Sequence, residues 1–384
     1  MENLSEKYYP GIYIHIPFCI SRCSYCDFFS STDLNSIEKY VNALIKEIEL
    51  FSGTQNFTKE IDTIYLGGGT PSLLSAKQLD SILGSIHQHF NVLTNSEITL
   101  EANPGTIDLK YAQDYMNAGV NRISFGIQSF DNSELKFLNR IHTAEEAVAS
   151  FNIIRSIGFD NISIDLIFGI PNQNEKIWEN NLNNALLLNP EHISVYNLIY
   201  ESDTKLYSDL NKNLFNIMPE NLEEKLYLRT SDFFTQAGYE HYEVSNFAKP
   251  NFQARHNSKY WKHIPYYGFG PSSHSFSDGN RYRNYSNFAK YYNLIENGKL
   301  PIEEVEKLSD EEKFTEYLML GLRSDGIDNN FIREKYNLDI EYLLNTELKY
   351  LSMYFKKDSK KIKLTPSGYF VINEIIISLI KKQT

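Results

Sequence analysis

The sequence predicts an α/β fold of about six βα units, in which a parallel sheet curls into a partial (β/α)6-type barrel. Short β-branched or aromatic runs alternate with longer helical patterns over the first 240 residues. Between residues 240 and 300 the chain is rich in Tyr, Phe, Asn and Ser and has little helical periodicity, which returns after Leu300. We therefore expect a barrel at 1–240, an aromatic-rich extension at 241–300 and a small C-terminal helical, winged-helix-like domain at 301–384.

The elements of the barrel follow from hydrophobic periodicity and stop signals. Strands are expected near 12–16, 61–66, 97–101, 121–127, 161–167 and 191–197. Helices are expected near 35–52, 75–90, 108–118, 144–157 and 175–188, with Gly119 and Gly158 as C-terminal stops. Apolar runs such as ISIDLIF need helices on both faces of a sheet, and a parallel sheet closing into a barrel supplies them.

The remaining segments have their own signals. The aromatic content of 241–300 is too high for a solvated linker, so we expect it to pack across the open end or side of the sheet. The end of the chain, KIKLTPSGYFVINEIIISLI, is typical of a strand, a Thr-Pro-Ser turn and a closing helix.

Composition and charge exclude several classes of protein. With 42% apolar and 14% aromatic residues the chain is not disordered. The net charge of -12 argues against a whole surface that attracts nucleic acid or anionic lipid. No apolar run is long enough to span a membrane, and the N-terminus MENLSEKYYP lacks the pattern of a signal peptide. We expect a soluble, cytoplasmic protein without an integral membrane segment.

All three cysteines of the chain, Cys19, Cys23 and Cys26, lie in one loop directly after the first predicted strand. A disulfide framework would spread an even number of cysteines along the chain, so this clustering indicates a metal or cluster site. Three thiolates leave one position open on a [4Fe-4S] cluster, which usually takes four protein ligands. The alternatives are a zinc site completed by His15 or another histidine, and three unligated buried thiols.

These cysteines carry a resemblance to a known family. The CxxxCxxC loop after the first barrel strand resembles the radical S-adenosylmethionine (SAM) superfamily, which implies a [4Fe-4S] cluster on Cys19, Cys23 and Cys26 with SAM on the fourth iron. The segments YIHIPFC at 13–19 and GGGTP at 67–71 are similar to the oxygen-independent coproporphyrinogen III oxidase family. Independently of the family, Gly67 to Gly69 lack Cβ atoms and would let backbone groups approach a ligand closely, or would simply form a tight turn.

Polar residues are expected at the C-terminal edge of three further strands: Glu101, Gln128 and Asp165. A buried carboxylate needs a partner, which the ammonium and ribose groups of an aminoacyl-nucleoside would supply, or else an Arg or backbone N-H of the fold. Arg140 is either a bidentate partner for a carboxylate or a surface charge. The resemblance implies that the SAM site is lined by Tyr13, Gly68, Gly69, Thr70, Glu101, Gln128, Arg140 and Asp165.

The segment RHNSKYWKH at 255–263 contains HNxxYW, which is similar to the motif of the heme chaperone (HemW) branch of the oxidase family. This resemblance implies heme binding and delivery of heme to apoproteins. An imidazole, aromatic rings and basic groups suit the iron, the macrocycle and the propionates of heme. We favour His256 over His263 as the iron ligand, with Tyr260 and Trp261 as ring contacts, although a capped turn with aromatic core anchors would explain the same residues. The basic groups of the segment are Arg255, Lys259 and Lys262.

Two departures from the oxidase pattern decide between functions. Phe28 occupies the position of the oxidase's fourth cysteine, and the segment before the first strand is shorter. We therefore expect a heme chaperone that uses a [4Fe-4S] cluster, SAM and heme, with heme-accepting apoproteins, respiratory enzymes among them, as partners. We assign no catalytic residue and expect no nucleic-acid partner. The alternatives are a coproporphyrinogen III oxidase of heme biosynthesis and a zinc or redox module for protein interaction. Apolar helix faces in the C-terminal domain would suit a homodimer.

Overall fold

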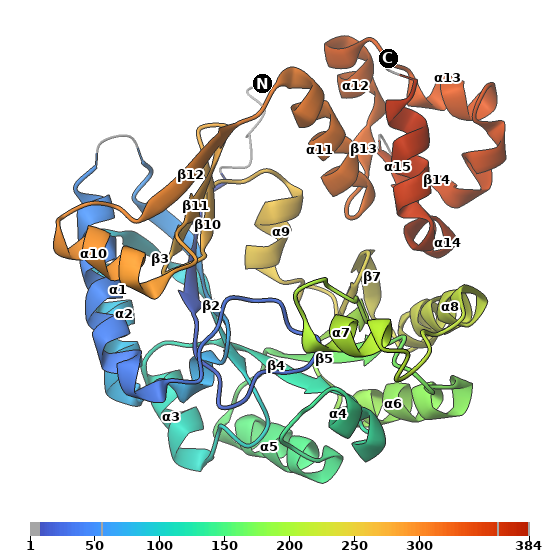
Figure 1. Cartoon of the computed structure of the whole chain (residues 1–384). Helices are drawn as coiled ribbons and strands as arrows, with labels where there is room; N and C mark the ends of the chain where they lie inside the picture. Colours follow the sequence, from blue (N-terminus) through green and yellow to red (C-terminus); the bar gives the residue numbers. More distant parts are fainter. Residues whose placement is uncertain (1–7, 55–56, 359–360, 383–384) are drawn as a thin grey trace.

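A curved sheet of twelve strands forms the body of the protein (Figure 1). The computed structural model describes residues 8–54, 57–358 and 361–382, so residues 1–7 of the predicted barrel domain lie outside the described residues. The strands are β1 (Gly11–Ile16), β2 (Glu60–Gly68), β3 (Asn91–Ala102), β4 (Arg122–Gln128), β5 (Ile162–Phe168), β6 (His192–Asn197), β7 (Glu240–Glu243), β8 (Asn246–Ala248), β9 (Tyr266–Phe269), β10 (His274–Ser277), β11 (Asn280–Asn284) and β12 (Ile302–Lys307). Their order across the sheet is β12-β11-β10-β9-β1-β2-β3-β4-β5-β6-β8-β7.

The six consecutive strands β1 to β6 of this sheet are parallel, as the sequence predicts. Strands β1 to β6 pair in chain order and in parallel, and each lies within a few residues of its predicted position. The largest difference is β3, which begins at Asn91 because Asn91 and Val92 pair with the start of β2 before a register shift. The sheet stays open as a partial barrel, with antiparallel strands at both edges.

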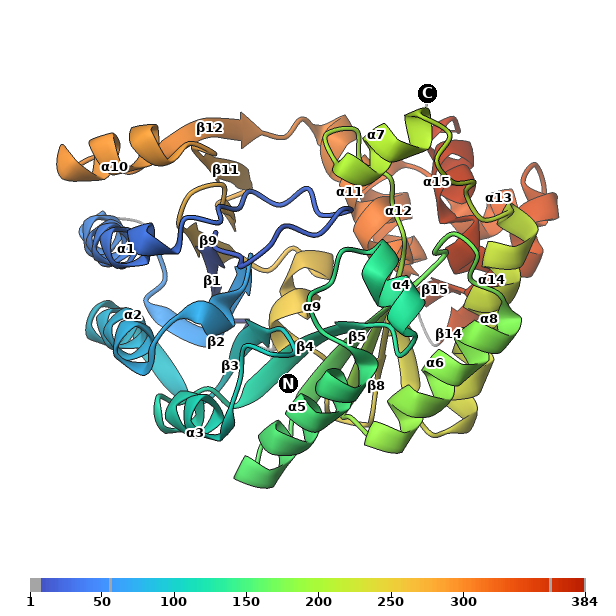
Figure 2. The ribbon, with the colours of Figure 1, turned by 60° about the horizontal axis from the view of Figure 1, so that its bottom comes forward.

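Helices cover the outer, convex face of the sheet (Figures 1 and 2). Those connecting the parallel strands are α1 (Ile37–Ser52), α2 (Ala76–His89), α3 (Leu109–Asn117), α4 (Asn132–Phe137), α5 (Ala144–Ile157) and α6 (Glu175–Leu188), and α7 (Lys205–Asn211) and α8 (Glu220–Gln236) follow β6. Capping boxes begin α2 at Ser75 and α5 at Thr143. The predicted stops are confirmed, since Gly119 and Gly158 take positive φ directly after α3 and α5.

The two faces of the parallel strands differ in chemistry, which corrects the expectation of strands that are apolar on both sides. The outward residues, such as Ile12, Ile14 and Ile16 of β1, belong to the hydrophobic core under the helices. The alternating inward residues are polar and bond to one another, as Ser163 and His192 do at 2.7 Å between Oγ and Nδ1. Only the outer face therefore needs a helical layer, and the inner face is free to form a polar site.

The aromatic-rich extension packs along the sides of the sheet. This is one of the two placements that the sequence predicted, the open end or the side. It contributes β7 and β8 beyond β6, and β9, in parallel, beside β1. It also forms α9 (Arg255–Trp261), which lies on the concave side of the sheet, and α10 (Phe288–Glu296). The buried Glu47 carboxylate of α1 fixes the extension by accepting hydrogen bonds from the Gly270 N-H, Asn284 and Tyr291. Strand β12 continues the sheet to Lys307, past the predicted boundary at residue 300.

The C-terminal region forms the predicted small domain. Its elements are α11 (Asp310–Leu322), β13 (Ile327–Asp328), α12 (Asn329–Tyr336), α13 (Ile340–Asn345), β14 (Phe355–Asp358), β15 (Lys361–Leu364), α14 (Pro366–Phe370) and α15 (Ile372–Ile380). A helix, a short strand, two helices and a hairpin in this order are typical of winged-helix domains, and the strands pair as β13-β15-β14. The predicted turn is confirmed, because Thr365 caps α14 and Pro366 opens it. Among the described residues, no helix combines the length and apolarity that crossing a membrane requires.

Candidate functional site

A cavity of about 450 Å³ opens at the C-terminal edge of the parallel strands. Residues at the ends of β2 to β6, and in the loops after β1, β2, β3, β4 and β6, line it. This is the edge where catalytic groups gather in α/β barrels. The predicted residues that it brings together are Cys19, Cys23, Cys26, Gly68, Gly69, Thr70, Glu101, Gln128, Arg140 and Asp165. Tyr13 lies below the cavity floor, where its hydroxyl is hydrogen-bonded to the Nδ1 of His15 at 3.0 Å.

Backbone hydrogen bonds hold the cysteine loop at both ends. The Cys19 N-H donates to the Ser31 carbonyl over 3.0 Å, and the Ser31 N-H donates to the Pro17 carbonyl over 2.8 Å. Farther along, the Ser24 N-H donates to Leu138, and the Ser24 carbonyl accepts from Leu206. The loop is therefore a fixed part of the fold, although its three thiols stay partly exposed to the cavity.

The surroundings of the thiols fit an iron-sulfur cluster. Arg140 donates to the Cys23 Sγ over 3.4 Å, and Thr70 donates to the Cys19 Sγ over 3.6 Å. Burial raises the pKa of the Cys26 thiol to about 11, so a bound metal is what would keep it a thiolate at neutral pH. Among the described residues no group of three His, Cys, Asp or Glu side chains is placed to hold one metal ion.

Arg140 is half-buried in the cavity wall, where its hydrogen bonds organise the site. Its guanidinium donates to the Gly126 carbonyl over 2.7 Å and to the Asn103 side-chain oxygen. Asn103 in turn donates to the Thr70 hydroxyl over 3.0 Å. Sequence reasoning missed Asn103, although its place two residues after Glu101 at the end of β3 was the available signal.

Glu101 and Asp165, two of the carboxylates that line the cavity, have different partners. Glu101 accepts from the Tyr65 hydroxyl over 2.7 Å and from the Gly68 N-H over 3.1 Å, so its partners belong to the fold. Burial raises the pKa of Glu101 to about 7 and that of Asp165 to about 6. The Oδ1 of Asp165 is buried and has no hydrogen-bond partner among the described residues. A ligand hydroxyl or ammonium group would satisfy it.

Close packing against neighbouring residues explains the glycine run, and backbone conformation explains the orientation of Gln128. A Cβ on Gly69 would lie 2.6 Å from the Phe18 carbonyl, and one on Gly68, which has positive φ, 2.5 Å from the His15 ring. Gly68 and Gly69 thus leave room for β1 and the start of the cysteine loop, and they also line the cavity. Gln128 has a φ of 71° beside a register shift between β4 and β5, which directs its side chain into the cavity wall.

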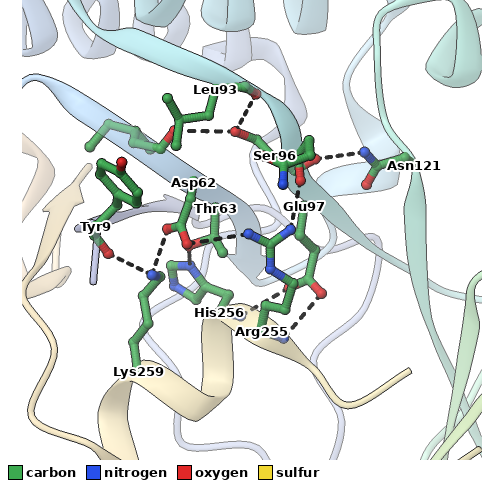
Figure 3. Close-up of polar contacts among 12 residues, drawn as sticks. Tyr9, Asp62, Thr63, Leu93, Ser96, Glu97, Asn121, Arg255, His256 and Lys259 are labelled. Atoms are coloured by element: carbon green, nitrogen blue, oxygen red, sulfur yellow. Dashed lines mark hydrogen bonds and ion pairs between the residues drawn. The ribbon is translucent and has the colours of Figure 1, made fainter. Parts of the chain in front are cut away.

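The HNxxYW segment lies away from this cavity, on the inner face of the sheet (Figure 3). His256 is fully buried, with its Nδ1 2.9 Å from the Thr63 hydroxyl and its Nε2 2.9 Å from the Tyr260 hydroxyl. Burial lowers the pKa of His256 to about 3, so the ring is neutral. Both ring nitrogens are engaged. Heme ligation by His256 stays a prediction, and it would require one of these bonds to open.

Two of the three basic groups of the segment, Lys259 and Arg255, form ion pairs with Asp62. The Lys259 ammonium donates to Asp62 and to the Tyr9 carbonyl, each over 2.6 Å, and Arg255 pairs with Asp62 at 3.2 Å. The Glu97 carboxylate accepts from the backbone N-H groups of Arg255 and His256 and so caps the first turn of α9. The structure thus joins α9 to β2 and β3. The remaining residues of the predicted heme site, Trp261, Lys262 and His263, lie at or after its end, partly or fully exposed.

Sequence reasoning also missed the mouth of the cavity and one wall residue. Four apolar side chains at the mouth are 49% to 63% exposed: Ile20, Phe28, Ile141 and Ile199. Such a patch around a pocket marks a contact surface. His142 lines the wall, donates from Nε2 to the Ile127 carbonyl over 3.1 Å, and has no partner for Nδ1 among the described residues.

Comparisons with known proteins identify the family of the chain. Residues 13–184 match the model of the radical SAM superfamily. The chain is 34% identical to the heme chaperone HemW of Bacillus subtilis (strain 168), covering 94% of this chain and 97% of that protein. It is 36% identical to the heme chaperone HemW of Escherichia coli (strain K12), covering 70% of this chain and 71% of that protein.

A solved structure shows the same fold. Coproporphyrinogen III oxidase (HemN) from Escherichia coli, described as a radical SAM enzyme, superposes with a TM-score of 0.80 at 23% identity, covering 97% of this chain and 90% of the oxidase chain. At that identity the likeness concerns the fold, including the domains beyond the superfamily match. The identity to the chaperones along nearly the whole chain places this protein more narrowly: it belongs to the HemW heme chaperone family of the radical SAM superfamily.

Proposed function

We propose that this protein is a heme chaperone, which binds heme and transfers it to heme-accepting apoproteins, with respiratory enzymes as the predicted class of acceptor. The observation that carries the proposal is the identity to proteins named heme chaperones along 94% of this chain and 97% of the relative. Because the match spans the extension and the C-terminal domain, it extends well beyond the superfamily region at 13–184.

We propose further that the cavity holds a [4Fe-4S] cluster and SAM. Cys19, Cys23 and Cys26 would each bind one iron, and SAM would take the fourth. Three features support this: partly exposed thiols, the unpartnered Asp165 oxygen, and an Arg140 aligned with Cys23. Cluster and SAM together supply one-electron chemistry when bound. The proposed SAM contacts are Gly68, Gly69, Thr70, Glu101, Gln128, Arg140 and Asp165, all of which line the cavity.

Two places on the protein compete for the heme. The apolar mouth formed by Ile20, Phe28, Ile141 and Ile199 offers exposed side chains for the macrocycle, with the exposed Arg22 beside it for a propionate. The HNxxYW segment is the predicted alternative, with His256 as ligand and Tyr260 and Trp261 as ring contacts. We place the heme at the mouth, because the His256 ring is buried and bonded at both nitrogens.

Anaerobic titration of hemin into the reconstituted protein, followed at the Soret band, tests both the function and the place. We expect saturation near one heme per chain, weakened by the double change Phe28→Ser and Ile199→Ser. The matched control is Leu187→Ser, an 81% exposed leucine on α6, outside the cavity lining. Saturable binding that only His256→Ala weakens would move the heme to the HNxxYW segment. A wild-type chain that binds no heme would refute the function.

The second candidate is an oxygen-independent coproporphyrinogen III oxidase, which the fold of the oxidase structure favours. Phe28 stands where that family has a fourth cysteine, and its side chain is 59% exposed at the cavity mouth. Turnover of coproporphyrinogen with release of methionine and 5'-deoxyadenosine would establish the oxidase. Its absence, beside saturable heme binding, would leave the chaperone.

The C-terminal domain leaves some apolar side chains uncovered. Tyr350 is 64% exposed and Met353 is 73% exposed, both in the short 3-10 helix before β14. A homodimer through this domain stays a prediction, which sedimentation equilibrium would check.

A further inference from the structure

A chain of contacts joins α9 to the cavity through β2 and β3. The ring of His256 stacks on the ring of Tyr65, with centroids 5.2 Å apart and planes inclined by 29°. The Tyr65 hydroxyl then donates to the Glu101 carboxylate over 2.7 Å, and Glu101 lines the cavity. The histidine of the HNxxYW segment is thus two contacts from the proposed SAM site.

The His256 ring is held on every side. Its Nδ1 bonds to Thr63, and Glu97 accepts from the His256 N-H over 2.9 Å (Figure 3). Its Nε2 bonds to the Tyr260 hydroxyl. On β1, a Cβ added to Gly11 would lie 3.0 Å from the imidazole, so the glycine leaves the space that the ring occupies. These contacts therefore hold the His256 ring in the position in which it stacks on Tyr65.

Tyr65 contacts a second ring. It also stacks on Tyr13, with centroids 6.2 Å apart and planes inclined by 27°, and its side chain is buried. Tyr13 and His256 together fix the plane of the phenol, and that plane aims the hydroxyl at Glu101. Loss of either ring would free Tyr65 to turn, because buried side chains stay in one rotamer only while their neighbours fill the space.

We propose that His256 is a positioning residue for the SAM site, which braces Tyr65 and through it the Glu101 carboxylate. The inference deepens the proposed function and rests on its placement of SAM in the cavity. Glu101 is held by one oxygen on Tyr65 and the other on the Gly68 N-H, so its orientation toward a ligand depends on both. His256 then acts on the cofactor site without leaving the core.

The charge of Glu101 gives this proposal a second readout. Burial and the Asp165 carboxylate raise its pKa, whereas the Tyr65 hydroxyl, the Gly68 N-H and the buried Arg122 lower it. Removing the hydroxyl takes away one stabilising donor, so the carboxyl would protonate at higher pH. A residue that served only stability would not move the pH dependence of SAM binding.

The test is SAM affinity of the reconstituted protein, followed by the EPR spectrum of the reduced cluster, with hemin titrations run in parallel. We expect Tyr65→Phe, which keeps the ring, to weaken SAM binding roughly tenfold and to shift its pH profile upward. We expect His256→Ala to change SAM affinity and the SAM-bound EPR signal in the same direction, with iron content and heme binding unchanged. Tyr111→Phe, on the outer helix α3, is the matched control.

The outcomes separate this inference from the function on which it rests. A wild-type chain that binds no SAM overturns the cofactor proposal and this one with it. Wild-type SAM affinity, EPR signal and pH profile in both variants overturn the positioning role alone. So does a His256→Ala protein that loses heme but keeps SAM. Should His256→Ala fail to fold, Tyr65→Phe and Thr63→Val, which removes one partner of the His256 ring, decide the matter.

Discussion

Arg140 lines the cavity and donates a hydrogen bond to the Sγ of Cys23, 3.4 Å away. The same guanidinium holds the Gly126 carbonyl at the end of β4 and the Asn103 side chain after β3. One planar group thus ties the cysteine loop to two strand ends. This arrangement uses the geometry of a guanidinium rather than its charge alone.

We predict that Arg140→Lys weakens SAM binding at least tenfold while leaving the cluster in place. A lysine ammonium is a point charge that cannot reach three acceptors in one plane, so Cys23, Asn103 and Gly126 would lose their common partner. Titration of SAM against the reduced cluster, with iron content measured on the same sample, checks this. Arg22→Lys, at an exposed position of the cysteine loop, is the control. Equal SAM affinity in both variants would contradict the assignment.

We predict that Cys23→Ala abolishes the cluster but leaves cooperative unfolding intact. The loop is anchored by backbone bonds at Cys19, Ser24 and Ser31, none of which needs the Cys23 side chain. After anaerobic reconstitution, the wild type should bind about four irons and the variant close to none. Phe28→Ala should bind as much iron as the wild type. A broad, uncooperative unfolding curve for Cys23→Ala would show that the loop supports the fold.

We predict that Glu101→Gln stabilises the ligand-free protein at alkaline pH. The pKa of Glu101 is raised to about 7 from an ordinary value of 4.5, so between these values the folded state binds the proton that the unfolded state has lost. The wild type therefore loses stability as the pH rises through this range, and the glutamine variant does not. The gain should be about 3 kcal/mol above pH 7 and vanish near pH 4.5. Urea unfolding at pH 5, 6.5 and 8 measures it.

The same variant should bind SAM poorly, since it lacks the charge. A stability difference that is independent of pH would show that Glu101 is not protonated near neutrality. Asp165→Asn would then serve to locate the titrating group, because burial raises the pKa of Asp165 to about 6.

We predict unequal effects from the two ends of the ion pair that holds α9. The Lys259 side chain is 5% exposed, so Asp62→Ala would leave a buried ammonium group with only the Tyr9 carbonyl. That change should lower the free energy of unfolding by about 3 kcal/mol. Lys259→Met should lower it by about 1 kcal/mol, because Arg255 still pairs with Asp62. Asp209→Ala, in a pair with the exposed Lys205, should have almost no effect. Equal losses at Asp62 and Lys259 would contradict the ranking.

The sequence predicted the cavity better than it predicted the HNxxYW segment, and the reason is periodicity. Cys19 follows β1, Glu101 and Gln128 lie in the C-terminal halves of β3 and β4, and Asp165 lies in the middle of β5. Parallel strands bring their C-terminal ends to one edge. Their convergence needed only the positions of strands, which hydrophobic patterns show. Asn103 and His142 were missed because they lie in loops, whose paths no pattern specifies.

The HNxxYW segment shows the opposite limit. Its residue types suit heme, and nothing in the sequence shows that Thr63, Glu97 and Asp62 lie beside them, because those three are far away in the chain. The inward-facing polar positions of β2 and β3 were the available signal. Every second residue along a strand faces the same side of the sheet, so the polar side chains at 63, 97 and 101 share one face. Asp62 is the exception to this pattern.

The chaperone account is tested most directly by heme transfer. Reconstituted protein loaded with one heme is mixed under anaerobic conditions with a heme-free cytochrome, and the Soret band of each is followed after rapid separation. The account predicts that heme appears on the cytochrome faster than the chain releases heme spontaneously. It also predicts that no coproporphyrinogen is consumed in a parallel assay. Heme that stays on the chain, together with sustained oxidation of coproporphyrinogen and release of 5'-deoxyadenosine, would contradict it.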